Sequence, residues 1–175
     1  MVIHNLDTYA YVNNYVLILA NVVVFFLCLL LVGISLHIIA KRDRGLFNSA
    51  YKDELTGLYN RRAYEESLDR IRKEASSEKM IVVAIFDVNG LKEVNDKLGH
   101  ASGDELLRGA ASTIRSVYGS YGKCYRTGGD EFVVILEETV EKLFVLNENF
   151  EKAVAKWHGK QVEKLNISYG AALSE

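Results

Sequence analysis

The residues best suited to chemistry lie in one short segment, Arg126-Thr127-Gly128-Gly129-Asp130-Glu131-Phe132, directly before the apolar run 133–136. Two glycines between strand-like segments favour a tight hairpin of type I′, in which both central residues take a positive φ. Glycines allow a ligand to approach the backbone closely, and adjacent carboxylates suit a divalent cation. The segment therefore indicates metal-assisted phosphate chemistry at a hairpin tip, although the same turn is also typical of a solvated hairpin.

A further carboxylate, Asp87, follows the apolar run 80–86, which predicts a buried strand. Its side chain would emerge at the rim of a sheet, where Asp130 and Glu131 also arrive if their hairpin neighbours this strand. Three carboxylates without enough Lys or Arg nearby would repel one another, so such a site invites Mg²⁺. Lys92, near the start of the next expected helix, can reach phosphate. A hydrophilic strand end and a solvated lysine are the alternative interpretations.

Apolar periodicity and turn residues predict the elements that would position these side chains. Asn60 is a suitable N-cap for a helix, and Ser102 with Glu105 matches a capping box before a later helix. The order, a helix followed by β-α-β-β-α-β, is that of a ferredoxin-like α+β sandwich, and about 120 residues suffice for one such core. Strands are expected at 80–86, 123–127, 131–136 and 165–171, and helices at about 60–76, 91–98, 106–117 and 139–157.

Residues 15–40 carry no formal charge at neutral pH. As a helix they would extend roughly 39 Å, more than the ~30 Å hydrocarbon core of a bilayer. A signal peptide would have a basic start and a shorter apolar core, and a buried core helix of this kind would be unusual in so small a chain. The sequence therefore predicts a single membrane-spanning helix.

All 21 Lys and Arg residues lie at or after Lys41. The positive-inside rule then places residues 1–14 outside the inner membrane and the C-terminal part in the cytoplasm. We expect residues 41–52 to be a juxtamembrane linker that continues the helix, and residues 53–175 to form the cytoplasmic domain. The two cysteines, Cys28 and Cys124, make no disulfide framework, and a net charge of −2 gives no basic footprint for nucleic acid.

One long run, Phe86 to Leu107, reads FDVNGLKEVNDKLGHASGDELL and resembles the signature of diguanylate cyclase (GGDEF) domains. The segments 53–61, 126–132 and 166–170 are similar to three further motifs of that family, in the same order. The resemblance covers about residue 50 to 175. It implies a fold of the nucleotide-cyclase and polymerase-palm type. It also implies the synthesis of cyclic di-GMP from two GTP molecules, each ribose 3′-hydroxyl attacking the other's α-phosphate, in a homodimer whose product acts on downstream receptors.

Position by position, the resemblance implies roles for the acidic residues. Asp87, Glu131 and the Val88 carbonyl would bind Mg²⁺, for which Mn²⁺ is an alternative. Asp130 would activate the 3′-hydroxyl or help to hold a second metal ion, and Lys92 would stabilise charge on the phosphates. These roles fit phosphoryl transfer, in which positioning and charge neutralisation supply most of the rate.

The resemblance also implies the contacts to GTP. Asn95 and Asp104 would read guanine, because an amide donates and accepts while a carboxylate accepts from the N1–H and 2-amino edge. A helix C-cap and a helix N-terminal charge are the alternative interpretations of these two residues. His100 would contact ribose or base. The remaining expected contacts come from the turn: Arg126, Gly128 and Gly129.

The sequence departs from the family pattern at Asn89-Gly90, which removes no expected ligand, and at two further places. Gly119 and Gly122 stand where many relatives carry the Arg and Asp of a product-inhibition site, so we expect no product feedback of that type. Relatives also continue past the 166–170 segment into a helix and a strand that supply a lysine near the phosphates, whereas this sequence stops at Glu175, so we expect an incomplete domain. Two alternatives to the enzyme stay open: a truncated, catalytically weak module that binds GTP or a partner cyclase, and a membrane-anchored interaction protein without nucleotide.

Overall fold

The computed structural model describes residues 3–73 and 80–173; side chains in the first helix are described for residues 14–39, for Lys41 and from Ala50 onward. The chain divides into two compact units, Met1–Leu46 and Phe47–Glu175.

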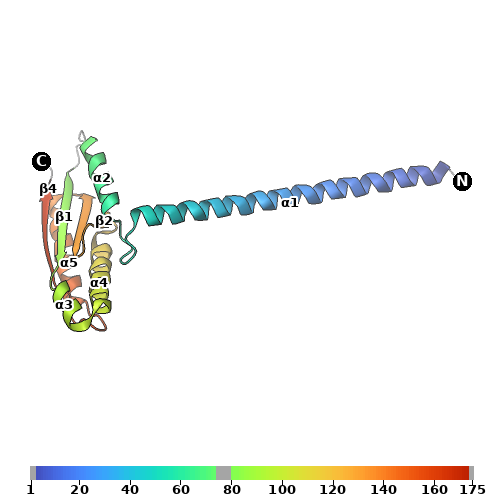
Figure 1. Cartoon of the computed structure of the whole chain (residues 1–175). Helices are drawn as coiled ribbons and strands as arrows, with labels where there is room; N and C mark the ends of the chain where they lie inside the picture. The colour runs from blue at the N-terminus through green and yellow to red at the C-terminus, as the bar shows by residue number, and fades with distance from the viewer. Residues whose placement is uncertain (1–2, 74–79, 174–175) are drawn as a thin grey trace. The chain divides into compact units, whose positions relative to one another are not determined.

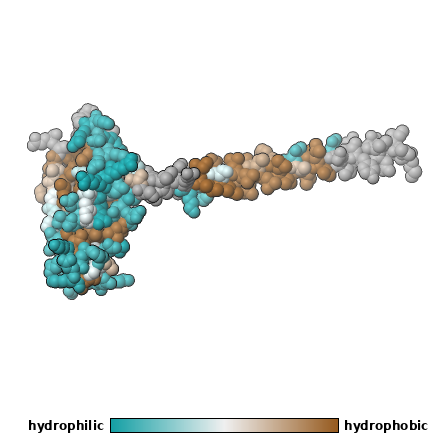
Figure 2. Space-filling model, viewed as in Figure 1, coloured by the Kyte–Doolittle hydropathy of each residue, from teal (hydrophilic) through white to brown (hydrophobic). Residues whose placement is uncertain are grey.

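Helix α1 (Ile3–Tyr51) supplies the first unit. Its segment Asn14–Ile39 is the one stretch, among the residues that the structure describes, long and apolar enough to cross a membrane by length and composition. The side chains of this segment are exposed all round, and Figure 2 shows them as a band of hydrophobic residues. The helix therefore covers the predicted span 15–40, and the expected linker beyond it stays helical to Tyr51.

The second unit is built on a four-stranded antiparallel sheet in the order β2-β3-β1-β4 (Figure 1). Strand β3 lies between β1 and β2, and β4 pairs with the other edge of β1. This split β-α-β arrangement confirms the predicted ferredoxin-like α+β fold. The strands are β1 (Ile81–Val88), β2 (Gly122–Arg126), β3 (Glu131–Glu137) and β4 (Ile167–Leu173).

Alternation along β1 separates the two faces of the sheet. Val82, Ala84, Phe86 and Val88 are buried on one face, where they pack with α4 and α5. On the opposite face a smaller cluster contains Ala63 of α2 beside residues of β2 and β3. The helices are α2 (Arg61–Lys73), α3 (Leu91–Leu98), α4 (His100–Tyr118) and α5 (Val140–Lys156).

Local signals for helix starts were right in one place and wrong in another. The Asn60 side chain accepts a hydrogen bond from the Ala63 N–H at 3.1 Å, which confirms the predicted N-cap of α2. The predicted capping box at Ser102 is wrong, because α4 begins at His100 and Ser102 lies inside it. Gly99, with φ +83°, turns the chain between α3 and α4 without a side-chain cap. The expected end of α2, residues 74–76, lies outside the described residues.

Candidate active site

Two of the predicted carboxylates face each other at one end of the sheet. Asp87 of β1 and Glu131 of β3 are direct partners in the antiparallel register, so their side chains share one face. Side chains paired in this way have Cβ atoms about 4.5–5.5 Å apart. Both residues are exposed, and Ser168 of β4 is the partner of Asp87 on its other side. The expected meeting of distant acidic residues at a sheet rim is therefore present for this pair.

Asp130 reaches the same rim through its backbone. Its carbonyl accepts a hydrogen bond from the Val88 N–H at 3.1 Å, which ties the turn to the last residue of β1. Within residues 3–73 and 80–173, however, no three Asp, Glu, His or Cys side chains gather closely enough to hold a metal ion. The expected convergence of three carboxylates is thus wrong in this geometry. Asp130 belongs to the bend before β3, whereas Glu131 is the first residue of that strand.

The remaining donor set still fits a hard divalent cation. Asp87 and Glu131 offer carboxylate oxygens from adjacent strands, and the Val88 carbonyl follows directly along β1. Mg²⁺ is held in proteins by one or two carboxylates with further oxygens from water and substrate phosphates. Two carboxylates and a carbonyl therefore suffice as the protein's share of such a site.

The turn between β2 and β3 differs from the predicted type I′ hairpin. Gly128 and Gly129 both lack a positive φ, and four residues, 127–130, separate the strands. Loops of this length are usually built on a type I turn, which explains the difference. The Glu131 carbonyl accepts from the Thr127 N–H at 3.0 Å and from the Gly128 N–H at 3.4 Å. A Cβ added to Gly129 would meet no atom within 4 Å, so the backbone there faces open space.

Arg126 holds this turn from the side. Its guanidinium donates to both carboxylate oxygens of Asp53, at 3.1 and 3.2 Å, and to the Gly129 carbonyl at 2.7 Å. The two side chains are only 14% and 23% exposed. Asp53 also accepts from the Thr56 N–H and hydroxyl, at 2.9 and 2.6 Å. The pair therefore links the start of the domain to the glycine turn.

The electrostatics of Asp53 follow from these contacts. Burial on its own would raise the pKa of the Asp53 carboxyl, but the hydrogen bonds from Thr56 and Arg126 outweigh burial and lower it. Sequence reasoning missed this pair, because Arg126 was expected to contact GTP. The spacing of Asp53 and Thr56 indicates a local turn, but nothing in the sequence connects that turn to residue 126. A contact of Arg126 with GTP stays a prediction.

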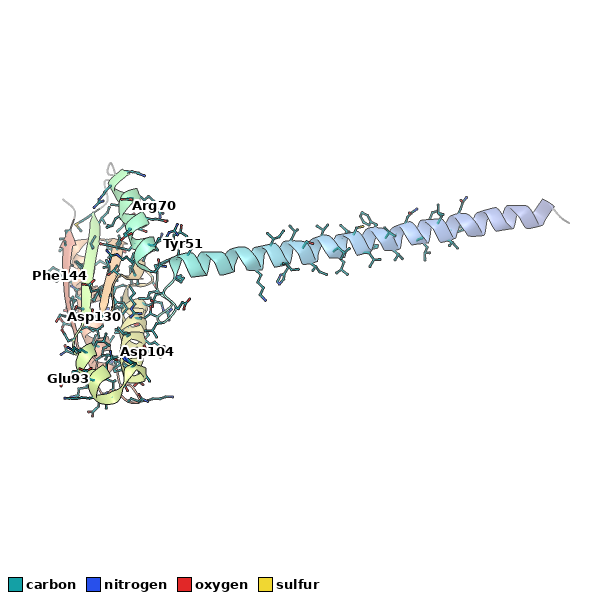
Figure 3. The ribbon with its side chains drawn as sticks, in the orientation of Figure 1. Tyr51, Arg70, Glu93, Asp104, Asp130 and Phe144 are labelled. Atoms are coloured by element: carbon teal, nitrogen blue, oxygen red, sulfur yellow. The ribbon has the colours of Figure 1, made fainter. Side chains whose placement is uncertain are left out.

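The predicted guanine-reading residues meet where α3 packs on α4. A Cβ added to Gly103 would collide with the Asn95 side-chain oxygen, so Asn95 lies directly against the α4 backbone next to Asp104. Asp104 is half-buried and lies 3.4 Å from the Arg108 guanidinium. Lys92 and His100 are exposed on the same pair of helices. Figure 3 labels Asp104 and Asp130 toward the end of the unit that carries α3.

Comparison with known proteins identifies the family. The sequence matches the family described as "Diguanylate cyclase, GGDEF domain" over residues 50–175. The chain belongs to this family. An uncharacterized membrane protein of Staphylococcus epidermidis is 34% identical over 124 residues, which cover 67% of this chain and 35% of that one. A membrane protein of Staphylococcus aureus is 33% identical with the same coverage. The chain thus spans about a third of the length of these relatives.

Solved structures of GGDEF domains share the fold. The coiled coil and GGDEF domain of DgcB from Caulobacter crescentus, in complex with c-di-GMP, is 27% identical with a TM-score of 0.72, and the match covers 81% of this chain and 78% of that one. The diguanylate cyclase SiaD of Pseudomonas aeruginosa, in complex with its activator SiaC, is 29% identical with a TM-score of 0.66, covering 81% of this chain and 57% of that one. These likenesses show that residues 50–175 share both the family and the fold of GGDEF domains.

Proposed function

We propose that this protein is a membrane-anchored diguanylate cyclase, which makes cyclic di-GMP from two GTP molecules as a homodimer. The pairing of Asp87 with Glu131 beside the open backbone at Gly129 carries the proposal. Two carboxylates at the rim and bare glycine next to them give room for a triphosphate and a place for its metal ion.

In the proposed reaction, Asp87, Glu131 and the Val88 carbonyl would hold a divalent cation such as Mg²⁺ or Mn²⁺, which would supply positive charge to offset the charge of the triphosphate. Asp130 accepts the proton of the ribose 3′-hydroxyl as that oxygen attacks the α-phosphate of the second GTP; the bond between the α-phosphate and the β-phosphate breaks, and pyrophosphate leaves. Lys92, which is exposed in the first turn of α3, stabilises the charge that develops on the phosphates in this proposal. Most of the rate then comes from positioning and from electrostatic stabilisation.

Guanine recognition belongs to the α3–α4 corner in this proposal. Asn95 packs against Gly103, the residue that precedes Asp104 in α4. An amide and a carboxylate held together can accept from the N1–H and the 2-amino group and donate to the O6 atom of guanine. His100 lies one turn before Asp104 and is exposed, so it can contact ribose or base.

The reaction joins two GTP molecules, so two sites must face each other across a dimer. We propose that α1 anchors each copy in the inner membrane, with residues 1–14 outside, the span at 15–40, a linker at 41–52 and the GGDEF domain, 53–175, in the cytoplasm. An apolar N-terminal helix and relatives named as membrane proteins support the anchor. The basic residues from Lys41 onward support this orientation.

The test is cyclic di-GMP formation by the full chain in membranes or detergent with GTP and Mg²⁺. We expect product from the parent protein and a loss of about 10²–10⁴-fold in Asp130→Ala, the scale of a removed general base. Glu131→Ala should lose the metal-dependent signal as well. Glu148→Ala, an exposed carboxylate of α5 paired with Lys152, is the matched control and should keep parent activity. GTP binding without product in the parent would favour a nucleotide-binding module, and no GTP binding would overturn the proposal.

A further inference from the structure

The loop between α5 and β4, residues 157–166, is attached to α4 beside the proposed guanine corner. The Glu105 carboxylate accepts three backbone hydrogen bonds from this loop. The Gln161 N–H lies at 2.8 Å and the Val162 N–H at 3.2 Å, and Lys160 provides the third donor. Three main-chain N–H groups on one carboxylate are an unusually complete set of acceptor contacts for a side chain at the surface.

Two further contacts place the same loop on α4. The Ser102 hydroxyl donates to the Gln161 side-chain oxygen. One helical turn beyond Glu105, the Trp157 indole lies so close to Gly109 that a Cβ at that glycine would collide with the ring. Val162 itself is buried in the main core. The loop is therefore fixed along the first three turns of α4 rather than resting on it at a single point.

Glu105 follows Asp104 directly, and successive helical residues point in different directions. Glu105 is turned to the loop, whereas Asp104 lies on the side of Arg108 and is accessible to solvent. Glu105 thus makes no contact with a base bound at Asp104. It acts on the helix turn that carries Gly103 and Asp104, and that turn is the part of α4 against which Asn95 packs.

We propose that Glu105 is a positioning residue for guanine recognition: by fixing the 157–166 loop on α4 it holds Asp104 and Gly103 in place against Asn95. The inference rests on the proposed function, because guanine is the ligand assigned to that corner. The hydrogen bonds from Lys160, Gln161 and Val162 also lower the pKa of the Glu105 carboxyl, so the acceptor stays ionised at neutral pH. Its role is independent of the metal site at Asp87.

The chain offers a direct probe of this arrangement. Trp157 is the one tryptophan of the sequence, and its ring packs on α4 in the loop that Glu105 holds. Fluorescence excited selectively at this indole therefore reports whether the loop is docked. Glu105→Ala removes the acceptor, and Glu105→Gln keeps one oxygen but turns an amide group toward the donors. Glu163→Gln is the matched control, because it neutralises a carboxylate of the same loop and keeps the Glu163 backbone carbonyl, which pairs with the His158 ring nitrogen at 3.1 Å.

The experiment measures Trp157 emission, GTP affinity and ITP affinity of the full chain, since ITP lacks the 2-amino group that Asp104 would read. In Glu105→Ala we expect a red-shifted Trp157 emission, because the loop is no longer held on α4. We also expect GTP binding weaker by about tenfold, the scale of one lost hydrogen bond between Asp104 and guanine. The preference for GTP over ITP should become smaller. Glu105→Gln should fall between Ala and parent, and Glu163→Gln should match the parent. Circular dichroism checks that each variant is folded.

Three outcomes overturn the inference. Parent-like Trp157 emission in folded Glu105→Ala would show that Glu105 does not hold the loop. Shifted emission with unchanged GTP affinity and unchanged GTP-to-ITP preference would show that the loop does not position the guanine corner. Absence of GTP binding in the parent protein would overturn the proposed function and this inference together. If the parent binds GTP, the first two outcomes contradict this inference alone.

Discussion

At the scale of single residues, Asp53 is the side chain whose removal should disturb the turn most while leaving every proposed catalytic group in place. In Asp53→Asn the Arg126 guanidinium loses its bidentate carboxylate partner in a partly buried position. We expect a loss of about 1.5–3 kcal/mol in the free energy of unfolding, the scale of a hydrogen bond to a charged group. Denaturant titration measures it, with Asp69→Asn, an exposed carboxylate of α2, as the control. Equal stability of the two variants would contradict the prediction.

The same residue makes stability depend on pH. The pKa of Asp53 is lower in the folded chain than in the unfolded chain, so the unfolded chain takes up the proton first as the pH falls. The contribution of Asp53 is therefore complete above the ordinary Asp pKa of about 4 and is lost as the pH drops through the lower folded value. We expect the stability difference between parent and Asp53→Asn to shrink between about pH 6 and about pH 3. Denaturant titration at each pH measures this difference. A difference in unfolding free energy that stays constant with pH would contradict the prediction.

Gly103 gives a second prediction at this scale. A methyl group there collides with the Asn95 side-chain oxygen, so Gly103→Ala should push Asn95 away from Asp104. We expect a higher KM for GTP with a folded protein, because one of the two side chains proposed to read guanine is displaced. Gly170→Ala is the control, since a Cβ at that position meets no atom within 4 Å. An unchanged KM in Gly103→Ala would mean that Asn95 has no part in binding GTP.

At the scale of elements, α5 carries two phenylalanines in contrasting settings. Phe150 is 1% exposed and packs edge-on against Phe86 of β1, with ring centroids 5.0 Å apart. Phe144 is 68% exposed and is labelled at the rim of the unit in Figure 3. We expect Phe150→Ala to lower the free energy of unfolding by about 3–5 kcal/mol and Phe144→Ala to change it by at most about 0.5 kcal/mol. Denaturant titration of the two variants measures this difference. Similar losses of unfolding free energy in both would contradict the assignment of Phe150, and not Phe144, to the core.

These elements also show which parts of the fold could be predicted from the sequence. Apolar runs and alternation predicted all four strands, because burial of one face imposes a period of two on the residues. The same reasoning does not distinguish the exposed Phe144 from the buried Phe150, since both are apolar residues of one helix. Glu105 was interpreted as half of a capping box, whereas its donors come from a loop some 55 residues later. Local patterns predict local partners. The two contacts that they missed, Glu105 with the 157–166 loop and Asp53 with Arg126, each join distant segments of the chain.

The candidate site also combines features that the sequence predicted with contacts that it did not. The meeting of Asp87 with Glu131 followed from strand order, which the sequence carries through its motifs. The type I′ turn failed because two glycines permit a positive φ without requiring it. The bidentate contact between Asp53 and Arg126 connects residues 73 positions apart and has no sequence signal of its own.

At the scale of the whole molecule, the remaining question is which side of the membrane each end occupies. We expect the N-terminus outside and the GGDEF domain in the cytoplasm, because Lys and Arg are absent before Lys41. Single added cysteines can test this, provided the native thiols stay silent. Cys28 lies within the apolar segment 14–39. Cys124 is buried, and burial raises the pKa of its thiol to about 11, so little thiolate is present at neutral pH.

An impermeant maleimide applied to intact cells should then label Asn5→Cys and leave the parent protein unlabelled. Ser120→Cys, on the exposed turn before β2, should react only after the cells are permeabilised. Each variant should be labelled in intact or in permeabilised cells. This labelling shows that the variant is expressed and that its added thiol is reactive. Labelling of Ser120→Cys in intact cells would put the domain outside, where cytoplasmic GTP cannot reach it, and the proposed cyclase would then have no substrate.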